Sequence, residues 1–234
     1  MINSHNVDCM NFMRGLPDKA YDLAIVDPPY GINIADTTTG TVIRNKSDKD
    51  TLIRKAWDTN TPDADYFTQL FRVSRNQIVW GGNYFGDILG YCKAPILWDK
   101  QNGDSPYADG ELAWTSSGLP RNLKIWRHQW CGAFKDSERG ATKIHPTQKP
   151  IALYRWLLQN YAKPGWKILD THGGSFSHAI ACDIEGYDLD ICELDKDYFE
   201  AGKKRFEDHL SQPRIFAPEP IEQPIQLSLI SNAQ

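Results

Sequence analysis

Four consecutive residues, Asp27-Pro28-Pro29-Tyr30, combine groups that could bind a flat amine. The prolines fix φ and supply no N–H, so the carbonyls of Asp27 and Pro28 are candidate acceptors beside the Asp27 carboxylate. Tyr30 offers an aromatic face for stacking. Acceptors next to a ring suit an aromatic amine such as the exocyclic amine of a nucleobase. A strand followed by an ordinary Pro-Pro turn is the alternative for so short a motif.

The tetrapeptide needs an element to hold it, and the apolar run over residues 21–26 predicts a buried strand that ends there. A second unit follows later in the chain. Residues 166–170 read as a strand, 171–177 as a glycine-bearing turn, 177–184 as a helix and 187–192 as a strand before Glu193. This order is typical of half a dinucleotide-binding fold, and it suits S-adenosylmethionine as well as NAD.

Three carboxylates, those of Asp27, Asp170 and Glu193, each end or follow a predicted strand. If the strands are parallel members of one sheet, all three lie at its carboxyl edge, where open α/β sheets bind ligands. The predicted class is therefore α/β, a Rossmann-like fold with a mostly parallel central sheet and helices on both faces.

Asp-Pro-Pro-Tyr after an apolar strand resembles the catalytic motif of the amino-methyltransferases that act on adenine N6 or cytosine N4 of DNA. The run from Asp8 to Asp18 resembles the lead-in to that motif, and residues 145–150, His-Pro-Thr-Gln-Lys-Pro, resemble the segment before the family's cofactor loop. The resemblance covers roughly residues 5–210. It implies S-adenosyl-L-methionine as cofactor, with the catalytic motif first in the chain and the cofactor motif last.

The resemblance assigns catalysis to Asp27, Pro28, Pro29 and Tyr30. It assigns cofactor binding to Asp8, Asp27, His145, Thr147, Lys149, Asp170, Gly173, Gly174, Ser175, Phe176 and Glu193. For Asp8, a helix cap before residues 10–15 is an equal alternative.

The cofactor loop departs from the family pattern Asp-Pro-Phe-x-Gly-Ser-Gly-Thr. Thr171 and His172 replace the proline and phenylalanine, and Phe176 stands at the second glycine, where a positive φ would favour glycine. The departure could alter the pocket, weaken binding or mark an inactive relative. We expect activity because Asp170, Gly174, Ser175 and Glu193 remain.

Residues 119–143 interleave six basic residues and several aromatic ones with two acidic residues. Basic residues neutralise phosphates, and planar side chains stack on bases or wedge between them. The stretch lies where the family inserts its target-recognition region, so we expect contacts with double-stranded DNA from Arg121, Lys124, Trp126, Arg127, Lys135 and Arg139. The alternative is a surface excursion whose tryptophans fill a core.

The chain is expected to form one catalytic domain over residues 1–210, with a mobile loop at 31–61 and an extended tail at 211–234. The peptide Gln226–Ile230 resembles the sliding-clamp ligands of bacterial replication proteins, although such motifs usually end in phenylalanine; a final strand or a disordered end is the alternative. Many family members of this arrangement dimerise, and compact ones are common in phages and prophages.

Composition limits other readings. The net charge of −4 argues mildly against a protein that coats nucleic acid, but it allows a local basic face. The five cysteines form no Cys-x-x-Cys pair and predict reduced thiols in a cytoplasmic protein, and the histidines lack metal-ligand spacing. No signal-peptide pattern and no membrane-length apolar run is present.

The sequence thus favours a DNA methyltransferase acting on adenine N6, because Asp more often opens the motif in the adenine enzymes. Three alternatives stay open. They are cytosine N4 methylation, a DNA- or clamp-binding relative with impaired catalysis, and methylation of RNA or of protein amides.

Overall fold

The computed structural model describes residues 1–32, 58, 61–103, 108–131 and 134–212. Its strands are β1 (Ile2–His5), β2 (Tyr21–Val26), β3 (Ser74–Trp80), β4 (Ile96–Asp99), β5 (Gly110–Thr115), β6 (Lys124–Arg127), β7 (Trp130–Cys131), β8 (Phe134–Lys135), β9 (Lys167–Asp170) and β10 (Asp188–Cys192). Its helices are α1 (Cys9–Arg14), α2 (Ala64–Val73), α3 (Gly86–Leu89), α4 (Ile151–Tyr161), α5 (Ser177–Glu185) and α6 (Lys196–Ser211). Most of the loop expected at 31–61 lies outside the described residues, as does the peptide Gln226–Ile230.

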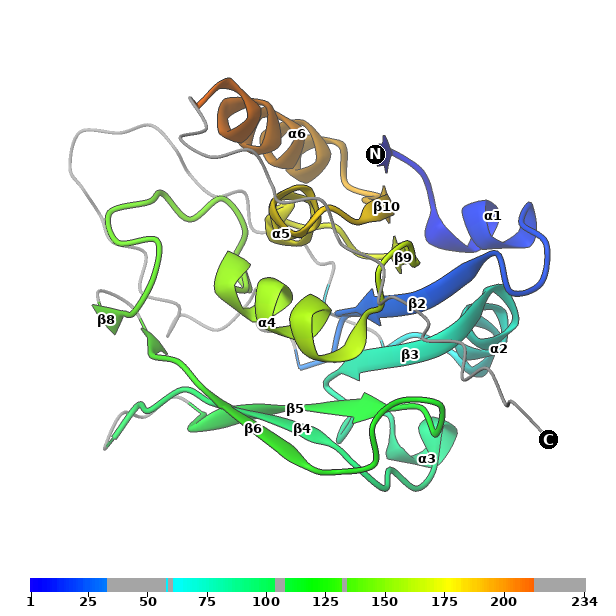
Figure 1. Ribbon diagram of the computed structural model, residues 1–234. Helices are drawn as coiled ribbons and strands as arrows, with labels where there is room; N and C mark the ends of the chain where they lie inside the picture. Colours follow the sequence, from blue (N-terminus) through cyan, green and yellow to red (C-terminus); the bar gives the residue numbers. More distant parts are fainter. Residues whose placement is uncertain (33–57, 59–60, 104–107, 132–133, 213–234) are drawn as a thin grey trace, which may run out of the picture.

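An eight-stranded sheet in the order β1-β10-β9-β2-β3-β5-β4-β6 forms the centre of the molecule. The pairings from β1 through β3 are parallel, β5 is antiparallel to both its neighbours, and β6 is parallel to β4. The arrowheads of β2 and β3 accordingly point the same way (Figure 1). The expected mostly parallel, Rossmann-like sheet is confirmed.

Helices cover both faces of the sheet because successive strand side chains alternate between them. Leu23 and Ile25 of β2 belong to the buried cluster that contains the apolar faces of α4 and α5. Ala24 and Val26, one residue out of phase, belong to the cluster with α1 and α2. This alternation makes β2 buried on both sides, as its continuous apolar run predicts.

Two strands of this sheet were not expected from the sequence. β1 extends the sheet at one edge by pairing with β10, and β6 extends it at the other by pairing with β4. Both carry mostly polar or exposed side chains and so lack the apolar pattern of a central strand. Part of the basic stretch 119–143 is therefore built into the central sheet.

Capping residues precede three of the helices. The side chain of Asp63 accepts from the backbone of α2, and Pro150 precedes the first turn of α4. Asp8 caps α1 by accepting from the amides of Met10 and Asn11, which confirms its capping role. Within the described ranges, no helix is both long and apolar enough to cross a bilayer.

The sheet has a switch point between β9 and β2. From β2 the chain proceeds to β3 on one side, and from β9 it proceeds to β10 on the other, while β9 and β2 pair directly. Crossovers that leave in opposite directions open a crevice at the carboxyl edge. Asp27, Asp170 and Glu193 end or follow β2, β9 and β10, so the expectation that they share this edge is confirmed.

Candidate active site

Tyr30 anchors the tetrapeptide that follows β2. Its hydroxyl donates to Asp27 Oδ1 over 2.6 Å, and its ring stacks on Tyr84 with centroids 4.9 Å apart. Gly81, at φ +72°, leaves room for this ring, since a Cβ there would lie 2.3 Å from it. One face of Tyr30 is therefore covered by Tyr84, which the sequence did not single out and which is 47% exposed.

The side chain of Lys149 points to Asp27. Its ammonium lies 2.5 Å from Asp27 Oδ2 and 3.0 Å from Glu111 Oε2, and Glu111 in turn pairs with Lys100. The sequence placed Lys149 in the cofactor site and overlooked Glu111 and Lys100. No motif marks these two residues, because their approach depends on how far β5 extends past β3.

Burial disfavours the charged forms of Lys149 and Asp27, and the opposite charges in this cluster offset that effect. Burial works against the charge of Lys149, but Asp27 and Glu111 raise its pKa above the usual value. Burial raises the pKa of Asp27; Lys149 opposes this rise and Glu111 adds to it. Lys149 therefore stays an ammonium and keeps a compensating charge beside Asp27.

The segment from His145 to Lys149 connects the two halves of the crevice. His145 contacts the edge of Tyr198 at 4.5 Å, and a Cβ on Gly174 would lie 3.7 Å from its ring. Burial lowers the pKa of His145 to about 3, so the ring is neutral at physiological pH. Thr147 Oγ1 lies 3.2 Å from His145 Nδ1, and two residues later Lys149 reaches Asp27.

Hydrogen bonds hold the glycine turn after β9 against β10. Glu193 Oε2 accepts from the amide of Gly174 at 2.8 Å, and the amide of Gly173 donates to the Cys192 carbonyl at 2.7 Å. Asp170 is buried; its carboxylate accepts from the His172 amide and lies 2.9 Å from His178 Nδ1. Asp170 thus shapes the turn, while Glu193 lies at its rim.

Ser175 and Phe176 complete the turn. Ser175 is buried, with its hydroxyl 3.1 Å from Ser177 Oγ and its carbonyl accepting from Arg205. Phe176 adopts φ +58°, the left-handed conformation for which glycine is normally used. Its ring is only 1% exposed and packs against Phe199. The ring thus lies in the core under α6.

The expected DNA-binding residues fall into separate groups. By register Lys124 is level with Trp80, at the end of β3, and Arg127 lies three positions further toward the carboxyl edge. Trp126 stacks on His128 and packs against the core, in agreement with the alternative that tryptophans fill a core. Lys135 lies over Trp130, and Arg139 donates to the Lys135 carbonyl.

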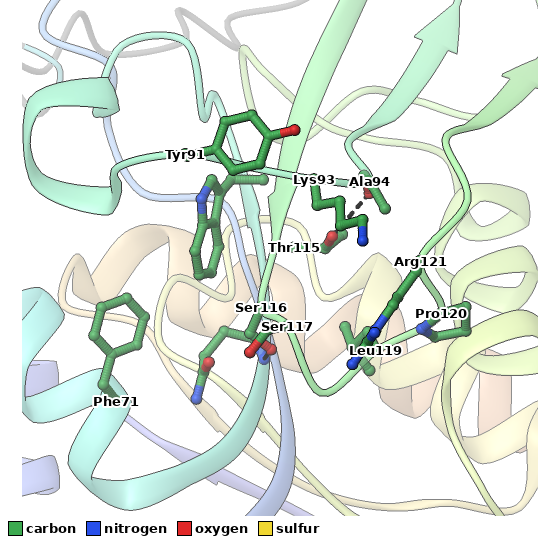
Figure 2. Close-up of a pocket in the computed structure, with 12 residues that line it drawn as sticks. Phe71, Tyr91, Lys93, Ala94, Thr115, Ser116, Ser117, Leu119, Pro120 and Arg121 are labelled. Carbon is green, nitrogen blue, oxygen red and sulfur yellow. Dashed lines mark hydrogen bonds between the residues drawn. The ribbon is translucent and has the colours of Figure 1, made fainter.

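Arg121 lies elsewhere, beside an open cavity of about 480 Å³ (Figure 2). The cavity is lined by Phe71, Gln77, Tyr91, Lys93, Ala94, Trp114, Thr115, Ser116, Ser117, Leu119, Pro120 and Arg121. The Thr115 hydroxyl donates to the Ala94 carbonyl at its wall. Since β5 runs antiparallel to β3, the end of β5 at Thr115 points away from the tetrapeptide. The cavity is therefore separate from the crevice that holds Asp27.

The described residues bring no three or more His, Cys, Asp or Glu side chains together in a metal-binding arrangement. The crevice instead offers carboxylates, a buried ammonium and a tight turn at the switch point of a parallel sheet. This is the architecture of the Rossmann-like fold of S-adenosylmethionine-dependent methyltransferases, which defines the class.

Comparisons with known proteins agree with this class. A family model described as DNA methylase matches residues 93–204. YubD of Escherichia coli (strain K12), described only provisionally as a methylase, is 25% identical over 210 residues, covering 85% of this chain and 87% of YubD.

Two solved structures share the fold. One is M1.HpyAVI in complex with SAM, with a TM-score of 0.58 and 19% identity, covering 88% of this chain and 98% of that one. The other is the PvuII DNA methyltransferase, described as cytosine-N4-specific, with a TM-score of 0.56 and 14% identity, covering 94% and 89%. Together these matches support a DNA methyltransferase related to the family that modifies adenine N6 or cytosine N4.

Proposed function

We propose that this chain transfers a methyl group from S-adenosyl-L-methionine to the exocyclic N6 amine of an adenine in double-stranded DNA. One observation carries the proposal. The amine-binding tetrapeptide and the glycine turn lie on neighbouring parallel strands, β2 and β9, and residues 145–149 contact both. Methyl acceptor and methyl donor can therefore meet in one crevice.

The residues of the glycine turn fit the cofactor. Glu193 presents a carboxylate one residue past β10, where ribose hydroxyls are bound in related folds. Each of its oxygens accepts one backbone amide, which leaves further lone pairs for a ligand. The buried ring of Phe176 does not occupy the outer side of the turn. S-adenosyl-L-methionine supplies a methyl group that its sulfonium charge has already activated.

The tetrapeptide prepares the acceptor amine. The lone pair of an exocyclic amine is delocalised into the base, so acceptance of its hydrogens by Asp27 and the Pro28 carbonyl favours a more tetrahedral, more nucleophilic nitrogen. Positioning and an oriented electrostatic environment supply most of the rate. Because the amine is stacked inside a duplex, the base must be flipped out before it reaches Asp27. Tyr30 then stacks on the flipped base.

The chain's basic residues would hold the DNA around this base. Lys124 and Arg127 are exposed on β6, and Arg127 lies nearer the carboxyl edge. Their charges suit the phosphates that flank an extruded nucleotide. A homodimer and clamp docking through Gln226–Ile230 stay predictions.

Cytosine N4 is the second candidate, favoured by the shared fold with the cytosine-N4-specific PvuII enzyme. Adenine is preferred because Asp27, rather than a serine, opens the motif. A single assay separates the two. The purified protein is incubated with labelled S-adenosyl-L-methionine and duplex DNA, and the digested nucleosides are identified by mass spectrometry. We expect N6-methyldeoxyadenosine; N4-methyldeoxycytidine would select the second candidate.

Two variants link the activity to the site. Asp27→Ala should abolish methylation, whereas Asp22→Ala, which removes an aspartate at the opposite end of the same strand, should retain it. Calorimetry with S-adenosyl-L-methionine tests the cofactor site separately. A wild-type protein that binds DNA, binds no cofactor and transfers no methyl group would instead be the catalytically impaired relative.

A further inference from the structure

A buried row of alternating charges runs through the crevice beyond the tetrapeptide. Asp27 Oδ2 is 2.5 Å from Lys149 Nζ, which is 3.0 Å from Glu111 Oε2; Glu111 Oε1 is 2.5 Å from Lys100 Nζ. The side chains of Lys149, Asp27 and Glu111 are only 4%, 16% and 22% exposed. Two carboxylates thus share two ammonium groups, with Lys149 between them.

The register of the sheet explains why Glu111 reaches this place. Ala113 of β5 pairs with Trp80, the last residue of β3, so β5 continues for three more residues beyond that level. Glu111 lies two positions past Ala113 and therefore on the same face. It overhangs the end of β3, beside the tetrapeptide that follows the neighbouring strand β2.

The two carboxylates hold Lys149 unequally. The ammonium makes a hydrogen bond to Asp27 Oδ2 and approaches the Tyr30 hydroxyl at 3.3 Å. Glu111 Oε2 is buried yet receives no well-oriented hydrogen bond within the described chain, although Lys149 Nζ is only 3.0 Å away. A buried acceptor without a full hydrogen bond is costly and needs an explanation. A small movement of the ammonium toward Glu111 would satisfy it.

The target amine would enter beside this ion pair. Asp27 Oδ1 already accepts from Tyr30 and Oδ2 from Lys149, so an amine that donates to the remaining lone pair of Oδ2 would lie against the Lys149 ammonium. We propose that Glu111 is a positioning residue that takes over the Lys149 ammonium when Asp27 binds the exocyclic amine of the target base. The transfer frees Asp27 while the positive charge stays in the crevice. This inference rests on the proposed function.

The test compares Glu111→Gln with wild type in steady-state methylation. Without the second carboxylate Lys149 stays on Asp27, so kcat should fall about 10- to 100-fold, the value of one hydrogen bond to a charged group. KM for the cofactor should stay unchanged, and Glu111→Asp should restore part of kcat. Glu185→Gln is the matched control, because the Glu185 carboxylate is 15% exposed and also pairs with a basic residue, Arg155, but at the end of α5.

The pH profile separates positioning from a merely structural role. The groups acting on Asp27 are Lys149, Glu111 and Tyr30, while Lys100 acts through Glu111. Loss of the Glu111 charge removes a repulsion that raises the pKa of Asp27, so the acid limb of the kcat profile should move to lower pH. An unmoved limb, or a kcat loss no larger than that of Glu185→Gln, overturns the proposal.

A carboxyl-carbon NMR titration of Asp27 without DNA gives a readout independent of turnover. Glu111→Gln should lower the pKa of Asp27 there also. If Glu111→Gln lowers the pKa of Asp27 but the wild-type protein methylates no DNA, the proposed function is rejected, and with it the role of Glu111 in catalysis. Methylation with an unaltered kcat in Glu111→Gln would reject only the role of Glu111.

Discussion

Replacement of Phe176 by glycine restores the residue type of the family loop, yet we expect it to destabilise the protein. Relief of the left-handed backbone at φ +58° gains about 1–2 kcal/mol. Removal of a ring that is 1% exposed costs about 3–5 kcal/mol. The net loss of about 1–4 kcal/mol should lower the melting temperature by roughly 2–16 °C for a domain of this size.

Gly202 on α6 provides the internal check. A Cβ there would lie 2.5 Å from Phe176 Cδ1, so Gly202→Ala should cost about 1–3 kcal/mol in the wild type. With Phe176→Gly the clash is gone, and the better helix propensity of alanine, worth about 1 kcal/mol, should offset the remaining 3.1 Å approach to the Gly174 carbonyl.

Urea unfolding followed by circular dichroism measures all four members of this double-mutant cycle. Gly86→Ala is the control: a Cβ there meets nothing within 4 Å, so its effect should be the same with and without Phe176. A higher stability of Phe176→Gly, or an equal cost of Gly202→Ala in both backgrounds, would refute the view that ring burial holds the strained turn.

Three further predictions follow from individual contacts. Burial opposes the charge of Asp190, but hydrogen bonds from His5, Lys167 and Tyr21 outweigh it and lower the pKa of Asp190. Its stabilisation is present above the unfolded pKa of about 3.9 and is lost as pH falls through the lower folded value. Asp190→Asn should therefore cost about 1.5–3 kcal/mol at pH 7 and much less near pH 3, as measured by urea titrations. Glu193→Gln should weaken S-adenosyl-L-methionine binding about tenfold or more by calorimetry, corresponding to about 1.4 kcal/mol, and an unchanged Kd would remove Glu193 from the cofactor site. Arg127→Ala should reduce the salt dependence of DNA binding by roughly one ion, while Arg121→Ala, beside the separate cavity, should not; equal slopes would contradict this division.

Local sequence was sufficient for the elements that hold the crevice. The apolar run of residues 21–26 became β2 with the expected bounds, because a strand buried on both faces needs apolar side chains at every position. The strand–turn–helix–strand unit from residue 167 to 192 followed for similar reasons. The sequence also showed Phe176 at a position where the family has glycine, and in the structure this residue has a positive φ.

Edge strands escaped prediction for the opposite reason. β1 and β6 each gain stability from a single neighbouring strand, and their mostly polar or exposed side chains carry no periodic apolar signal. The aromatic and basic residues of 119–143 likewise gave no sign that Trp126 stacks on His128, whereas Arg121 lines a separate cavity.

The sequence by itself determined the fold class and the residue types at the carboxyl edge, since both depend on interactions within a strand or turn. Only the tertiary structure decided which of these residues meet. Lys149 reaches Asp27, and Glu111 overhangs both, because of the register between β5 and β3 and the entry of residues 145–149 into the crevice. Such contacts join positions 38 to 122 residues apart, and no local pattern encodes them.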